Sequence, residues 1–126
     1  MQNNTFLIKN GVDNVLRLLQ HSQDSKLKLQ AAKSLQKIAQ TKVSALSMKL
    51  KTAKSVQILL DQIESEQNQD NTELLFYCKM GLLELTNAIE NQIEIEEKDG
   101  IKHLLSLALY KPKDLSEKLL FVKSIQ

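Results

Sequence analysis

The chain has 126 residues with three Gly, one Pro and a net charge of +2, and 42% of its residues are hydrophobic. This length suits one domain, and the scarcity of helix breakers among many Leu, Lys, Gln and Glu residues favours an all-α fold. The longest apolar runs have about seven residues, which excludes a helix of the roughly 20 residues needed to cross a bilayer, so no membrane insertion is expected.

The stretch FLIKNG ends at Gly11, a natural helix stop, and a short helix is predicted after it, at residues 12–20. Its apolar face consists of Val12, Val15, Leu16 and Leu19. The polar stretch HSQDS follows as a turn, in which Asp24 or Ser25 is suited to cap the next helix.

The next helix is predicted at residues 27–39, with the sequence LKLQAAKSLQKIA. Its apolar stripe, Leu27, Ala31, Leu35 and Ile38, is expected to fill the layer against a neighbouring helix. The small residues Ala31, Ala32 and Ser34 predict close packing, while Lys33 and Lys37 lie on another face.

The middle of the chain predicts further helices on either side of a polar loop. Helical spacing of apolar residues runs unbroken through 42–63, as one long helix or as two with a bend near Thr52. Residues 64–71 contain no apolar side chain and predict a loop, and residues 74–88 form another amphipathic helix.

The last third of the chain begins with a strongly acidic helix at 89–99, which Gly100 ends. A short apolar helix follows at 101–110, Pro112 breaks the chain, and residues 115–126 form the final helix. Apolar residues cover too much of this final helix for a free end, so we expect it to contact a partner through Phe121, Val122 and Ile125.

The apolar pattern repeats along the chain. Residues 27–39 match 74–86 at an offset of 47, and VLRLL at 15–19 matches VQILL at 56–60 at an offset of 41. The sequence that begins at Gly100 repeats the one that begins at Gly11. Such repetition predicts a helical solenoid, with approximate repeats at 1–40, 41–88 and 89–126.

The first repeat resembles the armadillo repeat, which has a glycine, a short helix ending in Leu-Leu, an acidic turn and a long helix with adjacent small residues. The matching residues are Gly11, Leu18, Leu19, Asp24 and LKLQAAKSLQKIA. The second repeat fits loosely, since Lys79 stands where the second small residue belongs. The resemblance implies one armadillo-like domain over residues 1–126, a short right-handed α-solenoid of about three repeats.

The resemblance also implies a groove along the third helix of each repeat. In importin-like members a Trp, and an Asn four residues later, hold an extended peptide there. These positions are Lys33 and Lys37 in the first repeat and Met80 and Glu84 in the second, so nuclear localisation peptides are not the expected ligand. A groove of Lys33, Lys37, Tyr77, Met80 and Glu84 would accept a segment that is acidic at one end, and a merely solvated lysine face is the alternative.

The charge is divided between the two halves of the chain. Residues 1–60 carry ten Lys/Arg and two Asp/Glu, and residues 61–126 carry seven and thirteen, so the halves have net charges of +8 and −6. The basic half, including Lys26, Lys42 and Lys49, favours an acidic protein surface such as tubulin or another cytoskeletal polymer. Self-association of opposite halves is a second option. Nucleic acid is disfavoured because aromatic residues are few and Arg17 is the single Arg.

The sequence contains no glycine-rich phosphate loop, His/Cys ligand cluster or nucleophile elbow, so no catalytic residue, metal or cofactor is expected. Cys78, the single cysteine, is expected to be a buried thiol, and its lack of a disulfide partner favours an intracellular, cytoplasmic location. We therefore expect a non-catalytic scaffold or adaptor within a larger assembly, for example a cytoskeletal or ciliary one. A nucleic-acid-binding helical module is the alternative from another class.

Overall fold

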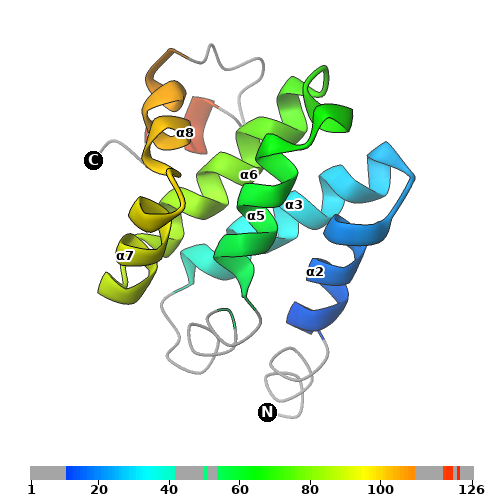
Figure 1. Ribbon diagram of the computed structural model, residues 1–126. Helices are drawn as coiled ribbons and strands as arrows, with labels where there is room; N and C mark the ends of the chain where they lie inside the picture. Colours follow the sequence, from blue (N-terminus) through cyan, green and yellow to red (C-terminus); the bar gives the residue numbers. More distant parts are fainter. Residues whose placement is uncertain (1–10, 42–49, 51–53, 110–117, 121, 123–126) are drawn as a thin grey trace.

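The computed structural model describes residues 11–41, 50, 54–109, 118–120 and 122 (Figure 1). Every element within these ranges is helical, which confirms the predicted all-α class. In chain order the elements are α2 (Val12–His21), α3 (Ser25–Gln40), α5 (Ser55–Glu64), the 3-10 turn η2 (Glu66–Asn68), α6 (Thr72–Leu85), α7 (Ile89–Glu97), α8 (Ile101–Ser106) and the 3-10 turn η3 (Leu107–Leu109).

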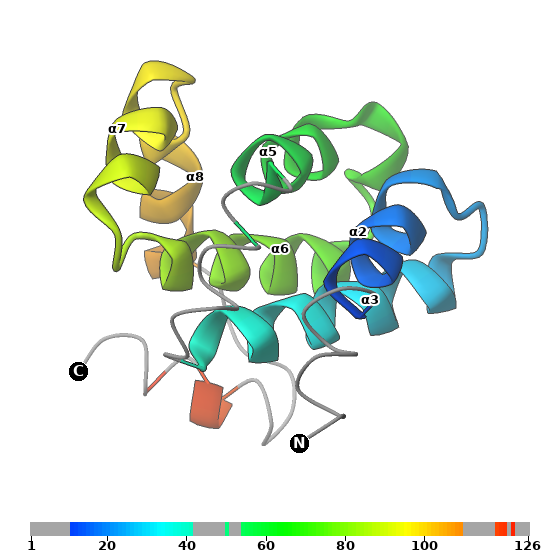
Figure 2. The ribbon, with the colours of Figure 1, turned by 90° about the horizontal axis from the view of Figure 1, so that it is seen from below.

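Two helical hairpins lie side by side in the structure. Helices α2 and α3 form the first, α5 and α6 form the second, and they meet through contacts of α3 with α6 and of α2 with α5. Figure 2 shows α3 and α6 together on one side of the molecule, with α2, α5 and α7 on the other. Helix α7 then contacts α5, and α8 contacts α6. The armadillo character of this arrangement stays a prediction.

The start of α3 is fixed by a side-chain cap. The Asp24 carboxylate accepts hydrogen bonds from the backbone N–H groups of Lys26 and Leu27, at 2.9 and 3.4 Å. These bonds satisfy two of the N–H groups that a helix start leaves unpaired. The predicted cap at Asp24 is therefore confirmed, and both helices of the first hairpin lie where the apolar spacing placed them.

Small residues bring α3 and α6 together. Ala31 and Ala32 are buried, and a Cβ placed on Gly81 of α6 would lie only 3.8 Å from the Cα of Gln36 in α3. Two other residues of the predicted packing face do not take part, because Ser34 is exposed and Leu27 has an exposed fraction of 46%. The apolar stripe of α3 is thus covered over only part of its length.

Helix α6 lies at the centre of the fold. It contacts α3, α5 and α8, so apolar residues are buried around most of its circumference. The Phe76 and Tyr77 rings meet edge to face with 5.2 Å between their centroids, a favourable arrangement for an aromatic pair. The imidazole of His103 in α8 lies 2.9 Å from the Glu64 carboxylate at the end of α5, joining the last helices to the second hairpin.

The segment predicted as one or two helices at 42–63 is interrupted before α5. Lys54 has a left-handed backbone with φ of 60°, and α5 begins at the next residue. Since a left-handed residue cannot continue an α-helix, the one-helix interpretation is wrong. The Ser55 hydroxyl donates to the carbonyl of Leu50 at 2.8 Å, which ties the start of α5 to the preceding chain.

The predicted polar loop at 64–71 is confirmed, and its side chains satisfy the end of α5. The Asn68 side-chain amide donates to the Gln62 carbonyl at 2.8 Å, and the Gln69 amide donates to the Ile63 carbonyl at 2.9 Å. A helix end leaves such carbonyls without partners in the helix itself. The lack of apolar residues in this loop therefore reflects a capping role.

Gly100 ends α7 as predicted, but for a different reason. The left-handed position that closes the helix is Asp99, with φ of 57°, and the N–H of Gly100 then donates to the Ile95 carbonyl at 2.7 Å. This is the Schellman arrangement. Gly100 itself has ordinary dihedral angles. A glycine is needed here because a Cβ would lie 2.8 Å from Cγ2 of Ile95 and 3.1 Å from Cδ2 of Leu60.

These two glycines give a matched pair of substitutions. Gly100→Ala is expected to lower the free energy of unfolding by about 1–3 kcal/mol, because its methyl group has no space. Gly81→Ala is expected to be neutral or to raise it by up to about 1 kcal/mol, since its Cβ would meet neighbours at 3.6 Å or more and Ala favours a helix interior. Urea denaturation followed by circular dichroism measures both, and equal losses in the two variants would contradict the packing described.

Candidate protein-interaction site

The structure brings together two residues of the predicted groove, Lys33 and Tyr77. The Lys33 ammonium lies 5.3 Å from the centroid of the Tyr77 ring, within the range of a cation–π interaction. It also lies 3.7 Å from the Glu73 carboxylate. Glu73 was missed in the sequence, although it precedes Tyr77 by four residues and therefore lies on the same face of the helix. Lys33 is thus partly neutralised.

The other predicted groove residues do not form a continuous open surface. Lys37 is exposed and Glu84 is half-buried, whereas Met80 has an exposed fraction of 0% and belongs to the core. Met80 occupies in α6 the position of Lys33 in α3, but α6 packs against α3, α5 and α8 and buries this position, whereas Lys33 in α3 is half-buried. The prediction that Met80 contacts a partner is therefore wrong, and Tyr77 is itself largely buried.

Among the partner-binding residues predicted in the basic half, Lys26 is exposed. Lys42 and Lys49 lie outside the described residues. Lys28, two residues after Lys26, is turned inward instead, and its ammonium donates to Oε1 of Gln62 at 2.9 Å. Neighbouring lysines of the basic half thus have different surroundings.

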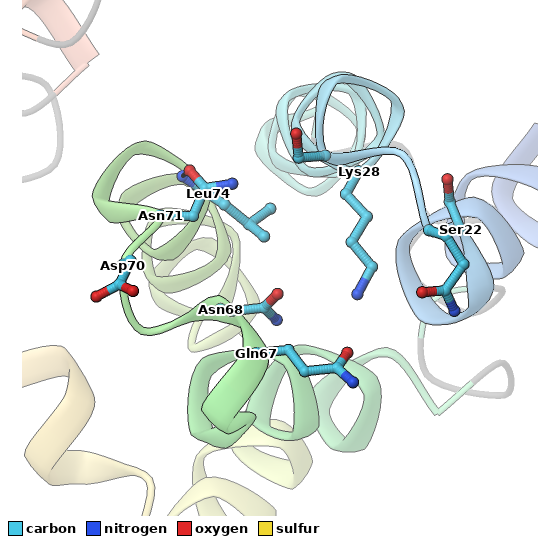
Figure 3. Close-up of a pocket in the computed structure, with 9 residues that line it drawn as sticks. Ser22, Lys28, Gln67, Asn68, Asp70, Asn71 and Leu74 are labelled. Carbon is cyan, nitrogen blue, oxygen red and sulfur yellow. Dashed lines mark hydrogen bonds between the residues drawn. The ribbon is translucent and has the colours of Figure 1, made fainter.

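Lys28 points into a cavity between the first turns of α3 and α6 (Figure 3). The cavity has a volume of about 520 Å³, and the loops before α3 and α6 complete its walls. Polar side chains predominate in the lining, and Leu74 is the apolar exception. The sequence alone did not point to this cavity, because its two walls, residues 22–28 and 67–74, are at least 39 residues apart in the chain.

Cys78 is buried in α6, as predicted, beneath this part of the molecule. Burial raises the pKa of the thiol from 9.0 to about 12, although the nearby charges of Lys28 and Lys79 act in the opposite direction. Partial burial also lowers the pKa of Lys79. A thiol with so high a pKa stays protonated near neutral pH, so Cys78 is a packing residue.

The described residues expose apolar side chains at the other end of the fold. Helices α7 and α8 and the turn η3 carry five large aliphatic residues with exposed fractions between 44% and 84%. We call them the α7–η3 apolar surface: Ile89, Ile93, Ile101, Leu105 and Leu109. Spacings of four residues place them on one stripe of α7 and one stripe that continues from α8 into η3. Acidic side chains flank the first stripe at Glu90, Glu94, Glu96 and Glu97.

The predicted partner-binding residues of the final helix are only partly described. Val122 is exposed, as a contact residue would need to be, while Phe121 and Ile125 lie outside the described residues. Leu120 next to them packs against the core. Leu119 is exposed as well, with an exposed fraction of 56%.

No family model matches this chain, and no characterised protein or solved structure is significantly similar to it. Within the described residues no group of three or more His, Cys, Asp or Glu side chains is placed to hold a metal ion. None of the described helices has the length and apolar character needed to cross a membrane.

The buried thiol predicts a pH dependence of stability. Between pH 9 and 12 the unfolded chain loses the Cys78 proton while the folded chain keeps it, so the free energy of unfolding falls as pH rises. This contribution has a slope of up to about 1.4 kcal/mol per pH unit. In urea denaturation between pH 8 and 10, wild type should therefore lose stability more steeply than Cys78→Ala. Parallel pH profiles for the two proteins would show that the thiol ionises equally in both states.

Proposed function

We propose that this protein is a non-catalytic, armadillo-like scaffold that binds another protein through the α7–η3 apolar surface. The observation that carries the proposal is the exposure of five large aliphatic residues at helical spacing in one segment of the chain. Scattered exposed apolar residues are normal on proteins, but grouped ones are typical of contact surfaces. The paired hairpins, which follow the order of the sequence repeats, support the armadillo-like interpretation.

Energetics favours a partner for this surface. Burial of an Ile or Leu side chain contributes about 1.5–3 kcal/mol, so partial burial of several of them outweighs the cost of ordering their side chains. Glu94 is paired with Lys98 at 2.6 Å, but Glu96 and Glu97 of α7 are exposed, and a partner surface with Lys or Arg around an apolar centre would complement them. The expected setting is a larger intracellular assembly, with a cytoskeletal or ciliary one as an example.

The test combines two substitutions on the apolar surface with a control elsewhere. Wild-type protein is used to purify a partner from the native source, and the complex is then reconstituted from purified chains. Ile93→Ser with Leu105→Ser is expected to raise the dissociation constant at least about tenfold, because each serine removes buried apolar area at the contact. The control is Leu27→Ser, on α3, which is comparably exposed and should change the constant less than twofold. Isothermal titration calorimetry measures the dissociation constants of wild type, the double variant and the control.

Two results would contradict the proposal. One is a wild-type protein that forms no reconstituted complex with any chain recovered from its source. The other is a complex that the double variant forms as tightly as wild type does. Circular dichroism of each variant confirms that a loss of binding is not a loss of folding.

Self-association is a second candidate function, favoured by exposed apolar residues on the basic part of the molecule. Leu18 and Leu27 are exposed there, next to Arg17 and Lys26. A second copy could place this surface on the acidic α7 face in a head-to-tail contact. Sedimentation velocity should then give an average mass that falls as the salt concentration rises. The mass should also be lower for the double variant Ile93→Ser with Leu105→Ser than for wild type. A single monomer mass at every salt concentration would exclude this candidate.

A further inference from the structure

The cavity between α3 and α6 contains the ammonium group of Lys28. The Lys28 ammonium donates to the neutral side chain of Gln62 at 2.9 Å, and no carboxylate of the described residues forms a salt bridge with it. Asp70 belongs to the same lining, but Figure 3 shows its carboxylate pointing away from Lys28. An ammonium retains donors for further acceptors after one hydrogen bond. Lys28 therefore presents an unused positive charge to the cavity.

Buried amides hold this cation in place. Gln62 and Asn68 have exposed fractions of only 6% and 4%. The Asn68 amide donates both to the Gln62 carbonyl at 2.8 Å and to the same Oε1 that accepts from Lys28, at 3.0 Å. The acceptor of Lys28 is thus fixed by a second hydrogen-bonded group. A charge positioned in this way binds an anion without a further cost of ordering a long side chain.

We propose that this cavity binds a glutamate or aspartate carboxylate of an acidic peptide segment in a partner protein. A single cation matches the single charge of a carboxylate, whereas a phosphate dianion would lack a second cation, because Lys28 is the single basic residue of the described lining. The volume of about 520 Å³ exceeds the size of one carboxylate. The side-chain amides of Gln23, Gln67 and Asn71 in the lining can pair with the backbone of the same peptide.

This inference rests on the proposed function only in that the occupant belongs to a partner protein. The cavity and the α7–η3 apolar surface involve different helices and different chemistry. Substitutions in the cavity are not expected to alter the α7–η3 apolar surface, and the reverse also holds. A loss of binding at one site can therefore be distinguished from a loss at the other.

The test is a titration of the full-length, ¹⁵N-labelled protein with acetylated tetraglutamate peptide, followed by amide chemical shifts. Saturable shifts are expected at Ser25, Lys28, Asn68 and Asn71, and an acetylated tetraglutamine peptide should give none. Lys28→Gln should raise the dissociation constant at least about tenfold, because a charge-assisted hydrogen bond is lost. Lys28→Arg should retain most of the affinity. The control Lys26→Gln removes an exposed lysine outside the lining and should change the constant less than twofold.

Three outcomes would overturn the proposal. The first is a set of tetraglutamate shifts that stay linear with concentration or that centre on the outer face of α3. The second is an equal loss of affinity in Lys28→Gln and Lys26→Gln, which would indicate general charge attraction. The third is saturation of the cavity resonances by inorganic phosphate but not by tetraglutamate, which would assign the cavity to phosphate groups. If Lys28→Gln fails to fold, the location of the wild-type shifts decides the question alone.

Discussion

The contact between α3 and α6 is the constraint on which the other features of this protein depend. It brings two helix backbones close because Ala31 and Ala32 face inward from α3 and Gly81 offers no side chain from α6. The contact also buries Gln36, whose Nε2 has no hydrogen-bond partner among the described residues. A buried, unpaired amide costs about 1–3 kcal/mol. The surrounding apolar packing of the two helices must therefore exceed this cost.

The same contact determines where the polar cavity forms. Residues from the first turns of both helices line it, which means that α3 and α6 run in the same direction and begin at the same edge of the fold. The loops that precede the two helices meet there as well. Lys28, one turn into α3, then lies beside the end of α5 and donates a hydrogen bond to Gln62. The position of the unused cation thus follows from the register of two helices.

The sequence predicted those features that depend on neighbouring residues in the chain. The Asp24 cap, the polar loop at 64–71 and most helix positions follow from local hydrogen bonding and apolar spacing. Its errors concern what surrounds a helix. Equating Met80 with Lys33 assumed equal surroundings for α3 and α6, but α6 is central and Met80 is buried. The apolar stripe correctly identified Leu35 as core, yet it does not show how far along α3 a neighbour extends, and Leu27 is exposed.

The pairing of Lys28 with Gln62 and of Lys33 with Glu73 could not be predicted either, because both contacts join separate hairpins. A net charge of +8 for residues 1–60 suggested that the basic half of the chain attracts an acidic protein surface. The structure shows that its lysines have different surroundings: Lys33 is paired with Glu73, Lys28 faces a cavity and Lys26 faces solvent. A net charge counted along the sequence thus describes the long-range field, while specific recognition depends on the few charges that tertiary contacts leave unpaired.

The two proposed sites differ in their chemistry, and this difference bears on how a scaffold could use them. Figure 1 shows the connection from α2 to α3 and the connection from α5 to α6 on the side of the molecule away from α7. The cavity near these connections would attract an acidic segment, whereas the α7–η3 apolar surface with its glutamates would attract an apolar and basic one. Salt screens an exposed charge contact more than it weakens apolar burial. Partners of opposite charge would therefore not compete for one site, and a rise in ionic strength would release the acidic partner first.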